Sequence, residues 1–396
     1  MAARVKLGRV FVAEGVNYFM LLGITLFLVA FGLVMVLSSS SVESFAAGQN
    51  FFTSFSSQGI AAIIGVPLML ILSRLPGRWW ARIAVVALIG SVLLQLLVFT
   101  GLGYGYGGNR NWLDLGFTSL QPSELSKLAL VLWLGKFLSD RRAEIDNWRR
   151  VLLPALIVSS VPIVLVLIGA DLGTAMIIGI IVLGSLFFAG VPLRQLGAVL
   201  AIAIPVVALA AQGSDSRRER IESWLNGCSA DYADTCWQIT HGTWALAAGG
   251  IFGVGLGNSK AKWSWLPEAD NDFIFAVIGE ELGMVGAVTV LVLFIVLAVV
   301  FARITGQLPP GSMGRISVSA TMVWIVAQAF VNIGVILGVF PVLGVPLPLI
   351  SAGGTALIVS LLVIGIALSF AREQPPAPAN ADGAEHAVAP RVRVRQ

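Results

Sequence analysis

Residues 266 to 302 read LPEADNDFIFAVIGEELGMVGAVTVLVLFIVLAVVFA, and this stretch decides the fold of the chain. From residue 273 onward it is an apolar run longer than the roughly 20 residues that a helix needs to cross the hydrocarbon of a bilayer. Five carboxylates nevertheless stand in or just before the run: Glu268, Asp270, Asp272, Glu280 and Glu281. An ionised side chain at membrane depth costs roughly 2.5–3.5 kcal/mol, so each of these charges is expected to face a cavity or a partner.

Two interpretations of Asp270 and Asp272 are open at this point. A carboxylate at the start of a helix can simply cap it, because it accepts hydrogen bonds from the unpaired N–H groups there. Alternatively, the carboxylates belong to a functional site. The polar residues elsewhere in the chain distinguish these two interpretations.

The composition excludes a soluble globular domain. Of the 396 residues 57% are hydrophobic and 12% charged, and the mean hydropathy is +0.90. The apolar runs are long and continuous, unlike the short alternating segments of an outer-membrane barrel. We therefore expect an all-α, polytopic integral membrane protein with about ten transmembrane helices. The expected spans are residues 16–40, 56–73, 81–101, 122–138, 151–169, 172–189, 195–212, 273–302, 316–340 and 354–371.

The placement of Lys and Arg predicts the orientation. Most of the 25 basic residues fall in alternate loops, which places both termini in the cytoplasm. The first apolar run is too long for the apolar region of a cleavable signal and follows a basic segment that stays inside, so it is expected to be a retained span. We expect a cytoplasmic segment at 1–15, a membrane domain at 16–371 and a disordered cytoplasmic tail at 372–396. The net charge of +4 then reflects topology and anionic lipid, not nucleic acid.

The longest polar interruption, about residues 213–272, is expected to be a large extracytoplasmic loop. A mixed-charge run from Ser214 to Trp224 suits a surface helix. The glycine-rich run at 249–257 is typical of a tight or re-entrant turn, although with Lys260 and Lys262 beside it a phosphate-holding loop is the alternative.

The same loop contains both cysteines of the chain, Cys228 and Cys236. On an oxidising side of the membrane a disulfide between them is expected, with two free thiols as the alternative. His241 has no second histidine nearby, so it is expected to be a hydrogen-bonded loop residue and not a metal ligand.

Further polar residues lie at the expected outer ends of other spans. Glu124 and Lys127 are three residues apart, which puts them on one helix face, and Arg110 lies upstream at the interface. Asp171 occupies a short turn between two spans. The pair is either structural or, together with Asp171 and Asp272, part of a site that binds an anionic headgroup and moves a proton.

The motifs resemble the SEDS family of peptidoglycan glycosyltransferases, and within it the actinobacterial form of the cell-division branch more than the elongation branch. The resemblance covers about residues 16–371. It rests on NRNWL (109–113), QPSE with Lys127, DLGTA (171–175), the GGIFGVGLGNS and LPEADNDFIFAVIGEELG block, and NIGVILGVFPVLGVPLPLISAGGT (332–355). The chain departs from the family pattern at Asp270, where a His is common, at Ala170, where a Pro is common, and at Trp237, where a Tyr is usual.

The resemblance implies a catalytic aspartate, which maps onto Asp272, and a cavity carboxylate and lysine, which map onto Glu124 and Lys127. The substrate of the family is lipid II, added to a nascent glycan strand during septal wall synthesis. Lys127 and Arg110 are candidates to stabilise the leaving pyrophosphate, with Lys260 and Lys262 in reserve and Asp171 in the same cavity.

A Mg²⁺ or Mn²⁺ ion held partly by phosphates would suit such a pocket, although no metal motif is present. The expected partners are a class B penicillin-binding protein and other division proteins in the plasma membrane. A lipid II flippase and a non-catalytic division scaffold are the alternative functions.

Overall fold

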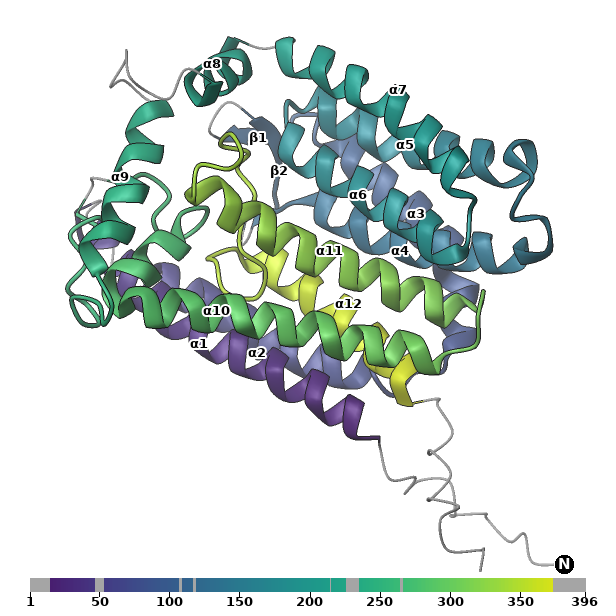
Figure 1. Cartoon of the computed structure of the whole chain (residues 1–396), viewed down its shortest axis with the longest axis horizontal. Helices are drawn as coiled ribbons and strands as arrows, with labels where there is room; N and C mark the ends of the chain where they lie inside the picture. The colour runs from purple at the N-terminus through teal and green to yellow at the C-terminus, as the bar shows by residue number, and fades with distance from the viewer. Residues whose placement is uncertain are drawn as a thin grey trace, which may run out of the picture.

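In the computed structural model the protein is a bundle of long helices that lie roughly side by side (Figure 1). The structure describes residues 15–46, 53–106, 109–116, 119–213, 215–225, 235–263 and 266–372. The segment 1–14 and the tail 373–396, and with them the expected disorder of the tail, lie outside the described residues.

All ten expected spans are helical. The ten helices are α1 (Val16–Ala46), α2 (Thr53–Leu72), α3 (Gly77–Leu97), α4 (Pro122–Asp140), α5 (Leu153–Ile168), α6 (Leu172–Ala189), α7 (Leu193–Gln212), α10 (Ile274–Gln307), α11 (Met313–Ile336) and α12 (Gly354–Arg372). Short helical turns at Arg142–Glu144 and Trp148–Leu152 lead into α5. Within the described part of the chain, nine helices are long and apolar enough to cross a membrane, and the one long helix left out is α4. The protein is thus a multi-pass membrane protein.

Helix α4 can hold charged residues because protein surrounds it. It contacts α3, α5, α6, α11 and α12, and most of its side chains from Pro122 to Leu138 are buried. Its first residue is Pro122, which suits a helix start because the missing N–H would have no partner there. Two buried apolar clusters meet along it, one centred on α10, α11 and α12 and the other on α4, α5 and α6.

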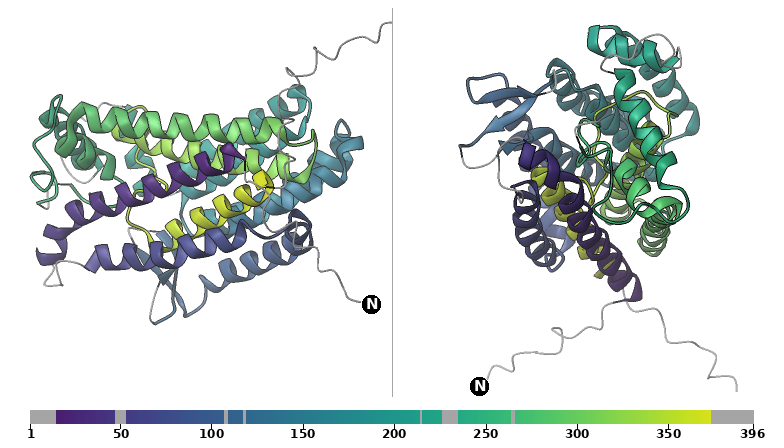
Figure 2. Two further views of the ribbon diagram at one scale, coloured as in Figure 1. Left: turned by 90° about the horizontal axis from the view of Figure 1, so that it is seen from below. Right: turned by 90° about the vertical axis from the view of Figure 1, so that its left-hand side faces the viewer.

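A small sheet joins α3 to α4, which the all-helical prediction missed. Its strands are β1 (Gly103–Tyr106), β2 (Asn109–Asp114) and β3 (Ser119–Leu120), antiparallel in that order. Gly103 pairs with Leu113, and Leu113 pairs with Leu120. Figure 2 shows the sheet projecting from one side of the bundle. The N–H of Arg110 donates to the carbonyl of Gly169, which fastens the sheet to the turn between α5 and α6.

The two ends of the bundle differ in charge. The connections α2–α3, α4–α5 and α6–α7 share one end and carry Arg74, Arg142, Arg150 and Arg194 (Figure 1). The sheet, the α5–α6 turn and the start of α10 lie at the other end. The assignment of these ends to cytoplasm and exterior stays a prediction.

The expected outer loop is partly helical. The mixed-charge run forms α8 (Asp215–Leu225), as expected, and a second helix, α9 (Thr235–Gly249), was not anticipated. The glycine-rich run after α9 forms turns, as the sequence indicated, with left-handed backbone at Gly253 (φ 80°). A Cβ on Gly253 would lie 2.1 Å from the carbonyl oxygen of Glu281, so only glycine fits this close approach.

Candidate functional site

The turn that precedes α10 carries Asp272. Hydrogen bonds from other segments hold the main-chain carbonyls of three consecutive residues in this turn. The Ala352 N–H donates to the Asp270 carbonyl at 2.8 Å, and the Ser351 hydroxyl donates to the Asn271 carbonyl at 2.7 Å. The side-chain amide of Asn332 donates to the Asp272 carbonyl at 2.8 Å. Residues 343–353, which we call the strap, and α11 therefore fix the backbone from which the Asp272 side chain projects.

One oxygen of the Asp272 carboxyl has no hydrogen bond among the described residues. Its Oδ1 is buried and has no hydrogen-bond partner among the described residues. Loss of solvent raises its pKa to about 7, and the carboxylates of Glu268 and Asp171 add to the rise, while Arg220 opposes it. No side chain caps α10, whose first flanking residue is Phe273, so the helix-capping interpretation of Asp272 is wrong.

Glu124 and Lys127 form the ion pair that their spacing predicted. The Lys127 Nζ lies 2.8 Å from Glu124 Oε1, and their side chains are only 2% and 3% exposed. The same ammonium donates to Gln328 Oε1 at 3.1 Å and lies 4.9 Å from the centre of the Trp324 ring. Lys127 is thus enclosed by protein groups, as a positioning residue would be.

Asp171 caps α6. Its Oδ1 accepts from the Thr174 N–H and its Oδ2 from the Asn111 side-chain amide, both at 2.8 Å. Burial raises the pKa of Asp171, while the charge of Lys127 lowers it and that of Glu124 raises it. Since Asp171 also raises the pKa of Asp272, its field links the Glu124–Lys127 pair to the turn before α10.

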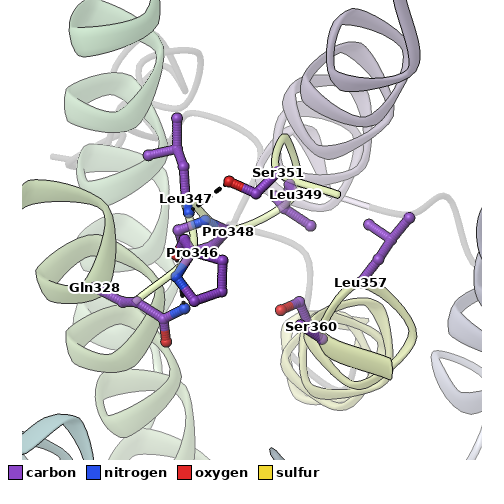
Figure 3. A pocket seen from close by; sticks show the side chains of 9 residues that line it. Gln328, Pro346, Leu347, Pro348, Leu349, Ser351, Leu357 and Ser360 are labelled. Atoms are coloured by element: carbon purple, nitrogen blue, oxygen red, sulfur yellow. Dashed lines mark hydrogen bonds between the residues drawn. The ribbon is translucent and has the colours of Figure 1, made fainter. Parts of the chain in front are cut away.

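Gln328 connects the pair to the strap. Its Nε2 donates to the carbonyl of Pro346 at 3.0 Å, and its Oε1 accepts from both Lys127 and the Trp324 indole. Figure 3 shows Gln328 and Pro346 beside a small cavity that Ser351 and Ser360 also line. One turn later on α11, the Asn332 amide donates to both the Val345 and the Asp272 carbonyls. Two amides on one helix face therefore hold the strap, and Asn332 also holds the turn before α10.

The other basic residues expected to bind the pyrophosphate, Arg110, Lys260 and Lys262, lie apart from the Glu124–Lys127 pair. Arg110 is exposed, and its Nη2 donates to the carbonyls of Thr100 and Gly103 within its own hairpin region. The Lys260 side chain is exposed. Lys262 is buried and belongs to a separate cluster, so its expected place as a reserve ligand of the pyrophosphate is not supported.

That second cluster, which we call the latch, holds the loop after α9 against the start of α10. The Lys262 ammonium lies 3.2 Å from Glu281 Oε1 and donates to the Gly257 carbonyl at 2.6 Å. Glu281 also accepts from the Ser38 hydroxyl of α1. Glu280 accepts from the Ser259 hydroxyl and from the Lys260 N–H at 2.9 Å. The two glutamates inside the apolar run are therefore fully partnered and structural.

The expected metal and disulfide stand as follows. In the described parts of the chain no group of three or more His, Cys, Asp or Glu side chains is arranged to hold a metal ion. Cys236 is disulfide-bonded, but Cys228 lies outside the described residues, so their pairing stays a prediction. His241 lies on α9 and not in a loop, with its Nδ1 2.8 Å from the Trp237 carbonyl oxygen.

Several residues of the site were not anticipated from the sequence: Asn111, Arg220, Gln328 and Asn332. A signal existed for two of them. Gln328 and Asn332 are amides four residues apart in the apolar second half of α11, a spacing that places both on one helix face. Arg220 could not have been chosen from three arginines in one short run.

The family comparison matches residues 18–375 to the cell cycle protein family of FtsW, RodA and SpoVE. A probable peptidoglycan glycosyltransferase FtsW from Mycobacterium tuberculosis is 38% identical over 362 residues, which cover 91% of this chain and 69% of the relative. Stage V sporulation protein E from Bacillus subtilis is 34% identical over 354 residues, which cover 88% and 95%.

Solved structures share the fold. A structure described as the structural coordination of polymerization and crosslinking by a peptidoglycan synthase complex superposes with a TM-score of 0.74 at 27% identity. The match covers 91% of this chain and 98% of that one. The crystal structure of the rod shape determining protein RodA from Thermus thermophilus gives a TM-score of 0.67 at 26% identity over 92% of this chain and 99% of RodA.

Proposed function

The chain belongs to the cell cycle protein family of FtsW, RodA and SpoVE, and we propose that it is a peptidoglycan glycosyltransferase with Asp272 as its general base. The activity agrees with that of relatives named as probable peptidoglycan glycosyltransferases, which match about nine-tenths of this chain at more than 30% identity. As the resemblance implied, the substrate is lipid II and the product a growing glycan strand.

One observation carries the assignment of the base. The backbone of Asp272 is clamped by the strap and by Asn332, while the buried Oδ1 of its carboxyl has no donor among the residues that the structure describes. A buried acceptor without a donor is costly, and function is a common reason for keeping one. A sugar hydroxyl is a donor of the right kind. Its arrival would supply the missing hydrogen bond and would place the proton within reach of the base.

The chemistry follows from that contact. The 4-hydroxyl oxygen of the incoming N-acetylglucosamine attacks the anomeric carbon of N-acetylmuramic acid on the growing strand. The carbon–oxygen bond to undecaprenyl pyrophosphate breaks with inversion, and the hydroxyl proton passes to Asp272. A positioned base typically contributes about 10²–10⁴-fold in rate. A pKa of about 7 suits the task, because the group is substantially ionised near neutral pH and still a usable proton acceptor.

The pyrophosphate leaves with negative charge and needs cations. Arg110 and Lys260 remain candidates because their side chains are exposed. Arg220 joins them because its charge acts on Asp272 and it lies on α8, which the Trp224 indole fastens to the Gly338 carbonyl at 2.9 Å. Lys127 acts indirectly and does not contact the pyrophosphate. It neutralises Glu124 and orients Gln328, which in turn holds the strap.

A divalent cation would help to neutralise the pyrophosphate if the phosphates themselves supply most of its ligands. The described residues do not offer a site for it on their own, since both oxygens of Asp171 already accept hydrogen bonds. The dependence on Mg²⁺ or Mn²⁺ stays a prediction, and no step proposed here passes through the ion.

The distribution of buried charge favours the enzyme over a lipid II flippase. Among the described residues, the buried Asp, Glu and Lys side chains all lie at the end of the bundle that holds Asp272. In the opposite half, buried polar residues such as Thr305, Ser317 and Ser319 are hydroxyl-bearing. A path for a charged headgroup would need polar groups along its whole length.

A transpeptidase is the expected partner, and the septal plasma membrane the expected location. The solved complex that superposes on this chain concerns polymerization and crosslinking together, which supports a class B penicillin-binding protein as the partner. Other division proteins are expected to join through the same assembly.

The test is polymerisation of lipid II by the purified full chain in liposomes, alone and with the class B penicillin-binding protein of the same organism. Asp272→Asn should lose activity to below a few per cent of wild type. The matched control is Asp140→Asn, an exposed carboxylate at the far end of α4 that should keep wild-type activity. Substantial polymerisation by Asp272→Asn would show that Asp272 is not the general base.

A further inference from the structure

An exposed apolar loop follows α9 and has no place in the chemistry above. It comprises residues 250–257, and its large side chains Ile251, Phe252, Val254 and Leu256 all point outward. Phe252 is 83% exposed, an extreme value for a phenylalanine in a region whose backbone is held on both sides. A contiguous exposed apolar patch marks a surface that binds lipid or protein.

Hydrogen bonds set the level of this loop along α10. The Met284 and Val285 N–H groups donate to the carbonyls of Gly250 and Ile251, at 2.9 and 3.2 Å. Two further bonds run from the Val254 and Gly255 N–H groups to the carbonyls of Glu280 and Glu281. The bonds form because Gly283, at φ 66°, interrupts the helix and frees these groups. The loop is therefore pinned beside residues 280–285.

The same level is where α10 starts to face lipid. From Ile274 to Glu281 every residue of α10 is buried in protein. From Met284 onward, exposed apolar residues recur along one face up to Val299. At 34 residues the helix is about 51 Å long, whereas the hydrocarbon core is about 30 Å thick. The hydrocarbon boundary thus lies near Met284, beside the loop.

We propose that the loop of residues 250–257 is a membrane anchor whose apolar side chains insert into the lipid leaflet next to the site. Its surface is continuous with the lipid-facing side of α10 through the contact of Ile251 with Val285. Exposed Trp244 and Trp263 flank it in sequence, and tryptophan is enriched at the membrane–water interface.

The latch makes the anchor rigid. Lys262 and Ser259, which follow the loop, are bonded to Glu281 and Glu280, and the Leu266 N–H then donates to the Ala261 carbonyl. The chain runs from there directly into the turn that carries Asp272. A loop fixed in the leaflet would therefore set the height of the catalytic turn above the hydrocarbon, where a lipid-linked substrate presents its headgroup.

The test measures depth and does not depend on activity. The full chain carries a nitroxide at Phe252→Cys or Leu256→Cys, is reconstituted in phosphatidylglycerol–phosphatidylethanolamine vesicles, and is examined by power-saturation spectroscopy with oxygen and with an aqueous nickel chelate. Val292→Cys on the lipid face of α10 is the reference for a label within the hydrocarbon. Lys260→Cys is the reference for a label in water. Unmutated protein taken through the same labelling gives the background from the native cysteines.

Both loop labels should show oxygen accessibility close to that of Val292→Cys and several-fold lower nickel accessibility than Lys260→Cys, with depths of about 5–10 Å. Phe252 is exposed, so its replacement leaves the packed interior unchanged, and the second label guards against a local effect. Nickel accessibility equal to that of Lys260→Cys at both positions would overturn the anchor and leave the patch to a protein partner.

Discussion

The enclosed Glu124–Lys127 pair allows a sharp separation of structure from catalysis. Lys127→Met leaves the Glu124 carboxylate buried without its cation, and breaking a buried pair in this way costs about 3–5 kcal/mol. The cation–π contact with Trp324 adds about 0.5–2 kcal/mol. Gln328 Oε1 keeps the Trp324 indole as a donor at 2.9 Å, so its loss is small.

Adding Glu124→Gln removes the unpaired charge. The double variant should therefore recover most of the 3–5 kcal/mol and remain below wild type by the Trp324 contribution alone. Polymerisation should not recover, because the positive charge that acts on Asp171 and the donor that orients Gln328 are both gone.

The assay is a double-mutant cycle read twice, by unfolding in mixed micelles and by lipid II polymerisation. Lys136→Met is the matched control, because Lys136 pairs with Asp140 on the same helix at the surface. It should cost less than about 1 kcal/mol and leave activity unchanged. Recovery of both readouts in the double variant would refute a functional role for the pair. Failure of stability to recover would refute the coupling itself.

Three further outcomes are expected. Gly253→Ala should disorder the loop after α9, because the new Cβ would collide with the Glu281 carbonyl. Limited proteolysis should therefore cut this loop faster in Gly253→Ala than in the control Gly179→Ala, where a Cβ meets no neighbouring atom. Mass analysis after alkylation without reductant should find neither Cys228 nor Cys236 modified, and labelling of both would exclude the bridge. Asp272→Asn should melt about 2 °C or more above wild type at pH 8, with the gain shrinking toward pH 5. The pKa of Asp272 is raised in the folded state, so the stability that the wild type has below about pH 4 is lost as the pH rises through about 7. The amide of Asp272→Asn does not ionise and avoids that loss. An unchanged melting temperature at pH 8 would mean that folding does not desolvate the Asp272 carboxyl.

Local patterns predicted much of the architecture. All ten spans became helices, and the start of α4 at Pro122 and the Glu124–Lys127 contact follow from spacings within one helix turn. The turn at Asp171 likewise needs only its neighbours, because the side chain caps the helix that begins one residue later. Such features are predictable because every interacting group lies within four residues.

The rest depends on contacts between distant segments. The Lys262–Glu281 pair forms only because the glycine turns bring the loop back onto α10, so Lys262 looked available to a phosphate in the sequence. The anchoring of Asp272 by Asn332 spans 60 residues and depends on the path of the strap. The sheet was missed because its strands are short and rich in glycine and asparagine, which are poor strand formers.

The pH dependence of lipid II polymerisation tests the role of Asp272 most directly. With a pKa of about 7, about 9% of the carboxyl is ionised at pH 6 and about 91% at pH 8, so the rate should rise about tenfold between them. In Glu268→Gln, which removes a carboxylate that raises this pKa, the midpoint of the rise should move to lower pH. A rate that is flat from pH 6 to pH 8, or a midpoint that Glu268→Gln leaves in place, would contradict Asp272 as the general base.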